Sequence, residues 1–211
     1  MKLDRLLDEP ARARIVAAVR TAEAKSEAQV VPVVVTRSTG HSEALYRGAL
    51  AGAVLATLLV FWRDSGASLR LLVYLQALGG AAGALLASVP PLERLLLGRR
   101  ALAEAAWRRA ERAFLEHHLD RTEKRTGVLL FASLFERQAV VLGDEGIHAE
   151  MAEGGWRAAA EALTDGLRSG RAADGFCAAI ALCGDKLAEH FPRNNGDSRN
   201  ELPDTLQVER S

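Results

Sequence analysis

Several features that would assign a chain of 211 residues to a familiar class are scarce or missing from this sequence. Lysine plus arginine number 27 and aspartate plus glutamate also number 27, so overall charge excludes a nucleic-acid binder. Cys177 and Cys183 are the only cysteines, and their spacing places them on different faces of an expected helix rather than in a disulfide. Two unpaired thiols fit a reducing compartment.

Targeting and catalytic motifs are also missing. The opening stretch, MKLDRLLDEPARARIV, carries charges throughout and no apolar core, so we expect no signal peptide. The sequence contains no Gly-x-Ser-x-Gly elbow, no Walker phosphate loop and no His-Glu-x-x-His zinc helix. Where a cysteine phosphatase has its arginine, Cys177 is followed by Cys183 and Cys183 by Glu189. The sequence therefore assigns no catalytic residue.

What the chain does contain is a pair of long apolar runs, Ala44 to Trp62 and Leu71 to Val89, separated by the polar turn RDSGASLR. A membrane-spanning helix needs about 20 predominantly apolar residues, and both runs reach about that length. The one residue within them that is charged at neutral pH, Arg47, lies near the outer end of the first run, from which it can reach lipid headgroups. The layout predicts a transmembrane helical hairpin, with a soluble helical hairpin as the alternative.

Small residues recur four apart in both runs, at Gly48 and Gly52 and at Gly79 and Gly83. This spacing lets two antiparallel helices approach backbone to backbone in lipid.

Arginines are distributed unevenly around the hairpin. Only Arg63 and Arg70 lie in the turn, whereas Arg37 and Arg47 precede the spans, and a larger set follows them: Arg94, Arg99, Arg100, Arg108, Arg109 and Arg112. The positive-inside rule then predicts a two-span protein of the cell inner membrane with both termini in the cytoplasm. The arginines after the hairpin either contact anionic headgroups or form a solvated face with Glu104 and Glu111.

The remaining sequence predicts one α/β domain that the hairpin interrupts. The run Gln29 to Thr36 is β-branched on both faces and indicates a buried strand, although Pro32 favours an edge or bulged position. The other expected elements are helices Leu3 to Lys25, Leu92 to about Arg125, Trp156 to Ser169 and Asp174 to Phe191, and strands Val128 to Ser133 and Gln138 to Leu142. We expect a small mixed sheet sandwiched between helices. The divisions are residues 1–41 and 92–192 for the domain, 42–91 for the hairpin, and 193–211 for a polar tail.

This order of elements, with the segment TGVLLFASLFERQAVVLGDEGI, resembles the TPM domain, a small α/β/α module with a central mixed sheet found in photosystem II repair proteins and bacterial envelope proteins. The inserted hairpin, with CGDKLAEHFP and the tail NELPDTLQVE, is similar to a bacterial branch of TPM-domain membrane proteins. The resemblance implies two properties. Some TPM domains are described as acid phosphatases, and some bind calcium through an acidic residue ahead of the glycine that opens the second strand. Here Thr126 holds that place before Gly127, so this anionic ligand is missing.

One acidic loop, GDEGIHAE, offers Asp144, Glu145 and Glu150 as hard oxygen ligands for calcium or magnesium. Its alternative role is structural, with Asp144 capping the following helical turn. His117 and His118 are adjacent on an expected helix, point about 100 degrees apart and do not share a metal; we expect one packed and one exposed.

The functional expectation is a membrane-anchored TPM-like domain that acts as a protein-binding or assembly module at the inner membrane. Its expected partners are membrane lipids, contacted by the hairpin and the basic helix, and unidentified proteins, with no nucleic acid. The alternative is a metal-assisted acid phosphatase acting on phosphomonoesters.

Overall fold

The computed structural model describes residues 7–63, 66, 68–150, 154–193 and 202–209. The chain divides into two compact units, one made of residues 1–38 and 104–211 and the other of residues 39–103. We call the first the α/β unit and the second the hairpin unit.

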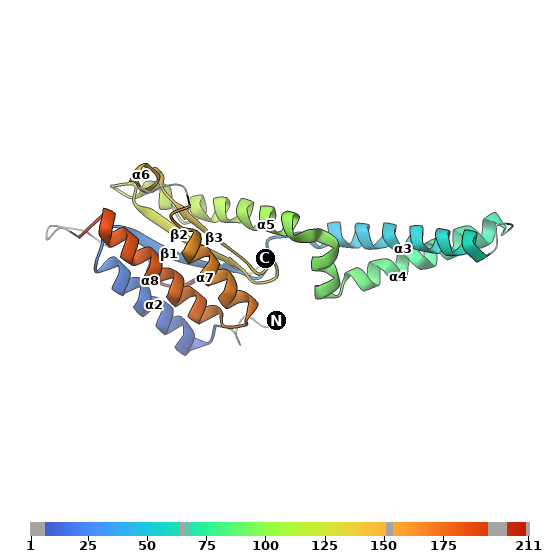
Figure 1. Ribbon diagram of the computed structural model, residues 1–211, viewed down its shortest axis with the longest axis horizontal. Helices are drawn as coiled ribbons and strands as arrows, with labels where there is room; N and C mark the ends of the chain where they lie inside the picture. Colours follow the sequence, from blue (N-terminus) through green and yellow to red (C-terminus); the bar gives the residue numbers. More distant parts are fainter. Residues whose placement is uncertain (1–6, 64–65, 67, 151–153, 194–201, 210–211) are drawn as a thin grey trace. The chain divides into compact units, whose positions relative to one another are not determined.

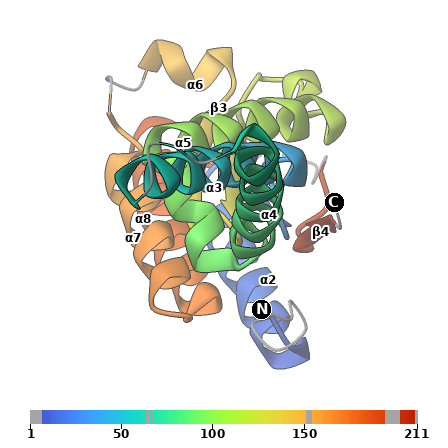
Figure 2. The same ribbon diagram turned by 90° about the vertical axis from the view of Figure 1, so that its right-hand side faces the viewer.

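The α/β unit is built on a four-stranded sheet with the strand order β3-β2-β1-β4. Strand β1 (Gln29–Val35) is parallel to β2 (Gly127–Ser133) over its whole length and parallel to β4 (Gln207–Glu209) over three residues. Strand β3 (Gln138–Gly143) is antiparallel to β2. The sheet is therefore mixed, and β4 forms one of its edges, at the margin of the unit that also holds the C-terminal end of the chain (Figure 2).

Helices cover both faces of this sheet (Figure 1). One face packs on α2 (Glu9–Glu23), α7 (Arg157–Arg168) and α8 (Ala172–His190) around the buried side chain of Phe176. The other face packs on the second half of α5, around Phe131. Because both faces of the sheet are buried, the sequences of β1 and β2 are nearly continuous apolar runs. The predicted fold class, a mixed sheet sandwiched between helices, is confirmed.

Three expectations about the elements are wrong. Helix α2 begins at Glu9, with Asp8 as its extended N-cap, so the helix expected from Leu3 does not include residues 7 and 8. Helix α5 (Pro90–Glu116) ends nine residues before Arg125, because His118 adopts a left-handed conformation (φ 56°) and a short 3₁₀ helix, η1 (Leu119–Arg121), follows. The tail after residue 193 is not only a polar extension, since it contributes β4 to the sheet. A helix α6 (Glu145–Glu150) follows β3 directly.

The hairpin unit contains α3 (His41–Arg63), α4 (Leu69–Ala87) and the first part of α5. Over 22 residues of α3 and the 19 residues of α4, both helices are long and apolar enough to cross a membrane. Ser68 begins α4 as its N-cap, and its side chain accepts a hydrogen bond from the backbone N–H of Leu71. Gly98 (φ 78°) interrupts α5 within this unit.

Candidate functional site at the edge of strand β1

Backbone hydrogen bonds show which residues of β1 face β2. The N–H of Gln29 donates to the carbonyl of Thr126 at 3.2 Å, and the carbonyl of Val35 accepts from the N–H of Leu134 at 3.1 Å. Backbone polar groups of successive strand residues point to opposite sides in the plane of the sheet. The odd-numbered residues of β1 therefore pair with β2, and Val30, Pro32, Val34 and Thr36 face the other edge.

Each N–H position on that outer edge is accounted for. The N–H of Val30 donates to the Glu23 carboxylate Oε1 at 2.8 Å. Pro32 has no N–H. Val34 lies in the register that pairs with β4, and the N–H of Thr36 donates to the carbonyl of Glu209 at 3.4 Å. The Glu23 side chain, a proline and strand β4 thus leave no unpaired N–H donor on the side of β1 that faces away from β2, which protects this side from pairing with another chain.

Glu23, at the C-terminal end of α2, is a buried carboxyl group at this edge. The pKa of Glu23 is raised to about 7, mainly by burial; the hydrogen bond from Val30 and the charge of Arg193 act to lower the pKa, and the nearby Asp204 acts to raise it. Asp204 also pairs with Arg20 at 3.1 Å. The carboxyl group of Glu23 therefore takes up a proton near neutral pH while facing the segment that carries Asp204.

The segment of residues 202–209 lies along β1 as an extended chain. Its backbone begins with a hydrogen bond from the N–H of Leu202 to Gln29 Oε1 at 3.3 Å. Leu206 and Val208 pack against the core on the α2 side of the sheet, and Leu202 packs against the core on the α5 side. We call residues 202–209 the edge segment.

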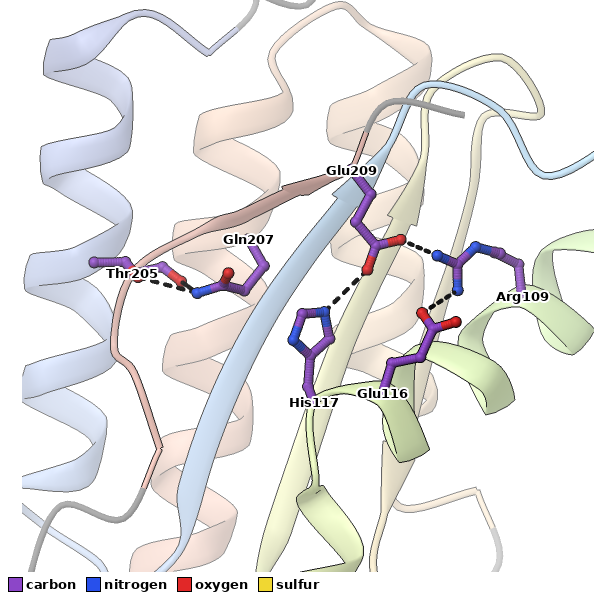
Figure 3. A network of polar contacts seen from close by, with 6 residues as sticks. All are labelled: Arg109, Glu116, His117, Thr205, Gln207 and Glu209. Atoms are coloured by element: carbon purple, nitrogen blue, oxygen red, sulfur yellow. Dashed lines mark hydrogen bonds and ion pairs between the residues drawn. The ribbon is translucent and has the colours of Figure 1, made fainter.

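The last described residue of the edge segment, Glu209, reaches a set of charged side chains on α5 (Figure 3). Its carboxylate pairs with the guanidinium of Arg109, and its Oε1 lies 3.0 Å from His117 Nε2. Arg109 also pairs with Glu116 Oε2 at 3.0 Å. The side chains of Arg109, His117 and Glu209 are each about four-fifths buried, at 23%, 21% and 22% exposure. Arg109 and His117 therefore form a partly desolvated receptor for one carboxylate, that of Glu209.

The acidic loop predicted as a metal site is only partly assembled. Asp144 Oδ1 accepts from the backbone N–H of Glu145 at 2.7 Å, and Glu145 pairs with Arg125 at 2.8 Å. Glu150 belongs to α6, but its side chain lies outside the described residues. Within the described part of the chain, no group of three His, Cys, Asp or Glu side chains is placed to hold a metal ion.

Asp144 nevertheless keeps one free oxygen. Its Oδ2 is buried without a hydrogen-bond partner in the structure. Calcium takes six to eight oxygen ligands, so this oxygen would be one ligand among several, and the metal site stays a prediction. The N–H of Glu145, the first residue of α6, donates to Asp144 Oδ1, whereas an N-cap side chain accepts from the second or third residue of the helix, so this bond alone does not establish the capping alternative.

A second buried carboxylate lies at the turn between β2 and β3. Glu136 Oε1 accepts from the backbone N–H of Ser38 at 3.0 Å, and its Oε2 accepts from the hydroxyl of Ser133. The two serine hydroxyls lie 2.8 Å apart. Because both carboxylate oxygens have donors, this cluster ties the end of β1 to the β2–β3 turn.

The two cysteines are free thiols, as expected. Cys183 is buried, and burial raises its pKa to about 12; burial also raises the pKa of Cys177. Both thiols therefore stay protonated at neutral pH, and neither is an activated nucleophile.

The histidine and arginine expectations are met in part. His117 is partly buried and His118 is exposed, as predicted. Arg108 pairs with Glu104 at 2.6 Å, as in a solvated charged face, whereas Glu111 accepts from the indole of Trp107 rather than from an arginine. In the hairpin unit, Arg47 donates to the carbonyls of Leu96 and Leu97, which the break of α5 at Gly98 leaves without helical partners.

Sequence reasoning missed the pairing of Arg109 with Glu209 and the buried Glu23 on the same side of β1. Pro32 was the available signal, because a proline within a β-branched run indicates that one side of the strand needs no donor there. The alternation in Leu206–Glu209 was a second, weaker signal of a strand.

These features define a mixed α/β unit interrupted by an apolar helical hairpin, with a charged receptor at one sheet edge. No family model and no curated protein sequence matches the chain. Among solved structures, the chain is similar to the NMR structure of BA42 protein from the psychrophilic bacteria Bizionia argentinensis sp. nov., at 18% sequence identity and a TM-score of 0.61, over 99% of each chain. At this identity the similarity shows the fold.

Proposed function

We propose that this chain is a TPM-like domain anchored in the bacterial inner membrane by two spans, and that it acts as a protein-binding or assembly module on the cytoplasmic side. The observation that carries the anchoring is the direction of the apolar side chains in the hairpin unit. Trp62, Leu58 and Leu85 are 87%, 62% and 73% exposed. Side chains of this kind are stable when lipid surrounds them.

The interior of the hairpin supports the same proposal. A Cβ atom added to Gly79 would meet the carbonyl oxygen of Gly52 at 2.6 Å, so the two backbones approach as closely as glycine permits. Gln76 Nε2 donates to Thr57 Oγ1 at 2.8 Å across the two helices. Small residues at the contact and a polar pair between helices are typical of helices that associate in lipid.

Sidedness in the proposal comes from the arginine distribution. Arg63 and Arg70 lie at the turn, whereas Arg94, Arg99 and Arg100 follow the second helix at once. With Arg37 and Arg47 on the same side, the positive-inside rule places both termini in the cytoplasm. Anionic headgroups are then the lipid partners of the exposed Arg99 and Arg100.

The binding role is supported by the outer edge of β1. A carboxylate receptor formed by Arg109 and His117 holds one acidic side chain of the edge segment, whose described residues pair with three residues of β1. Exposed sheet edges are a common route for recognising extended peptides.

The alternative function is a metal-assisted acid phosphatase acting on phosphomonoesters. The observation favouring it is the buried, unpartnered Oδ2 of Asp144. Purified full chain in detergent, assayed with p-nitrophenyl phosphate with calcium, with magnesium and with chelator, tests it. Metal-dependent hydrolysis that is lost in Asp144→Asn would establish the phosphatase and overturn a purely binding role.

The membrane anchor is tested by fractionation of cells expressing the full chain. We expect it to stay in the membrane pellet after high-salt and carbonate washes, since buried apolar helices rather than surface charge hold it. Release by carbonate would contradict insertion.

A further inference from the structure

The edge segment is bound to β1 by a small set of contacts. In the part of the chain that the structure describes, its strand β4 pairs with Val33, Val34 and Val35, and the N–H of Thr36 donates to the carbonyl of Glu209. On one side of the segment Val208 packs against the core, and on the other Glu209 enters the receptor of Arg109 and His117. Such a site binds two side chains and a short stretch of backbone of one extended segment. Sheet edges recognise extended peptides in this way.

The residues beside this pairing limit the length of any strand bound there. Toward the start of β1, Pro32 offers no N–H and the N–H of Val30 is already held by Glu23. Toward the start of β1, the ladder of an added strand therefore stops at Val33, and it continues past Val35 at least to the N–H of Thr36. The short ladder prevents long edge-to-edge strand pairing of the kind that leads to aggregation, but it leaves a site at which a short strand can pair.

The chemistry of the site specifies its ligand. The apolar position that Val208 occupies accepts an aliphatic side chain. The position that Glu209 occupies accepts a carboxylate, because the side chains of Arg109 and His117 converge on it (Figure 3). The parallel register with β1 fixes the direction of the ligand chain. Glu116 holds the other side of the Arg109 guanidinium and so orients it toward the site.

Resting on the proposed binding function, we propose that the outer edge of β1 is a peptide-binding site for a short extended segment of a partner protein, with an aliphatic residue followed by an acidic one, and that the edge segment occupies this site as an intramolecular competitor. A tethered competitor acts at an effective concentration of about millimolar, so a partner must present the same pattern at high local concentration. Confinement of both proteins to one membrane supplies such a concentration.

The test uses the full chain in detergent and a fluorescent peptide with the sequence of residues Leu202 to Glu209. The protein that binds the peptide in this assay is a full-length Val208→Asp, Glu209→Lys double variant. Its own edge segment no longer fits the apolar position of Val208 or the carboxylate receptor of Arg109 and His117. We expect this variant to bind the peptide at least about tenfold more tightly than the wild-type chain does. Should the double variant not fold, the single Glu209→Lys variant serves as receptor.

Specificity is tested with a matched peptide that carries lysine in place of Glu209. It should bind the double variant at least about tenfold more weakly, and an added Arg109→Glu change in the receptor should restore its binding. The proposal is overturned if the folded variant fails to bind the wild-type peptide or binds both peptides equally. It is also overturned if the wild-type chain dimerises by exchanging edge segments, since the occupant would then be a second copy. None of these outcomes depends on carbonate extraction or phosphatase activity.

Discussion

The hairpin unit and the α/β unit place opposite kinds of side chain on their surfaces. In the α/β unit, Phe131 and Phe176 are fully buried and charged residues form surface ion pairs such as Arg14 with Asp174. In the hairpin unit, Phe61 and Trp62 are exposed, and glycines and a polar pair fill the contact between helices. The same chain thus follows the rules of two solvents, water for one unit and, in the proposed setting, lipid for the other.

The largest expected effect separates two phenylalanines. Phe131→Ala, in the core of the α/β unit, should lower the free energy of unfolding by about 3–5 kcal/mol, because it leaves a cavity. Phe61→Ala, at a position 59% exposed in the hairpin, should leave the unfolding of the α/β unit unchanged. Denaturant unfolding of the full chain in detergent measures both. Equal losses would mean that Phe61 is buried against protein.

A charge in the hairpin is expected to have the next largest effect. Leu58→Asp or Ala82→Asp should impair insertion at a cost of roughly 2.5–3.5 kcal/mol for a charge near a helix centre. The share of protein left in the carbonate-resistant pellet reports it, and Leu58→Ala is the control. Solubility without loss of folding in both aspartate variants would favour a soluble hairpin.

Two neighbouring glycines sharpen the comparison within the hairpin. A Cβ at Gly79 would meet the Gly52 carbonyl oxygen at 2.6 Å, whereas a Cβ at Gly80 would meet its nearest atom at 3.4 Å. Gly79→Ala should therefore lower the melting temperature in detergent, by the equivalent of about 1–3 kcal/mol, while Gly80→Ala should not lower it. If both variants melt like wild type, the helices do not pack as described.

The smallest expected effect is a pH dependence confined to the α/β unit. The pKa of Glu23 is raised from 4.5 to about 7 in the folded chain, mainly by burial, so the folded state holds a proton that the unfolded state has lost. Stability from this group is present at low pH and declines as pH rises from about 4.5 to about 7. The groups facing Glu23 are Asp204, Arg193 and, through Asp204, Arg20.

Glu23→Gln keeps an acceptor for the N–H of Val30 and removes the titration. We expect its melting temperature to change less with pH over this range than that of wild type. Hydrogen exchange at the Thr36 amide, which the edge segment protects, gives a local measure of the same effect. A wild-type pH profile that Glu23→Gln leaves unchanged would assign the dependence to another group.

The sequence predicted the layered fold because burial on both faces leaves a direct trace in composition. Val30 to Val35 and Val128 to Ala132 are apolar at successive positions, which is the pattern of strands covered by helices. Two apolar runs of membrane length likewise predicted both hairpin helices. The end of α5 was missed because it depends on a single left-handed residue, His118, that no periodicity reveals.

The edge site could not be predicted because its members are far apart in the chain. Arg109 and Glu209 become neighbours only through the parallel pairing of a short strand with β1, and three residues carry too little alternation to indicate a strand. The acidic loop was the opposite case. Asp144 and Glu145 are adjacent in sequence, yet Asp144 Oδ1 accepts from the backbone N–H of Glu145, and the Glu145 carboxylate pairs with Arg125.

The central claim, two spans with the α/β unit in the cytoplasm, is tested most directly by thiol labelling of intact cells. In a Cys177→Ala background, Gly66→Cys places a thiol at the turn of the hairpin and Glu161→Cys places one on the exposed surface of α7. A membrane-impermeant maleimide should label the Gly66→Cys variant in intact cells and the Glu161→Cys variant only after the membrane is disrupted. Labelling of Glu161→Cys in intact cells with Gly66→Cys protected would contradict the orientation, and protection of both until disruption would contradict the two spans.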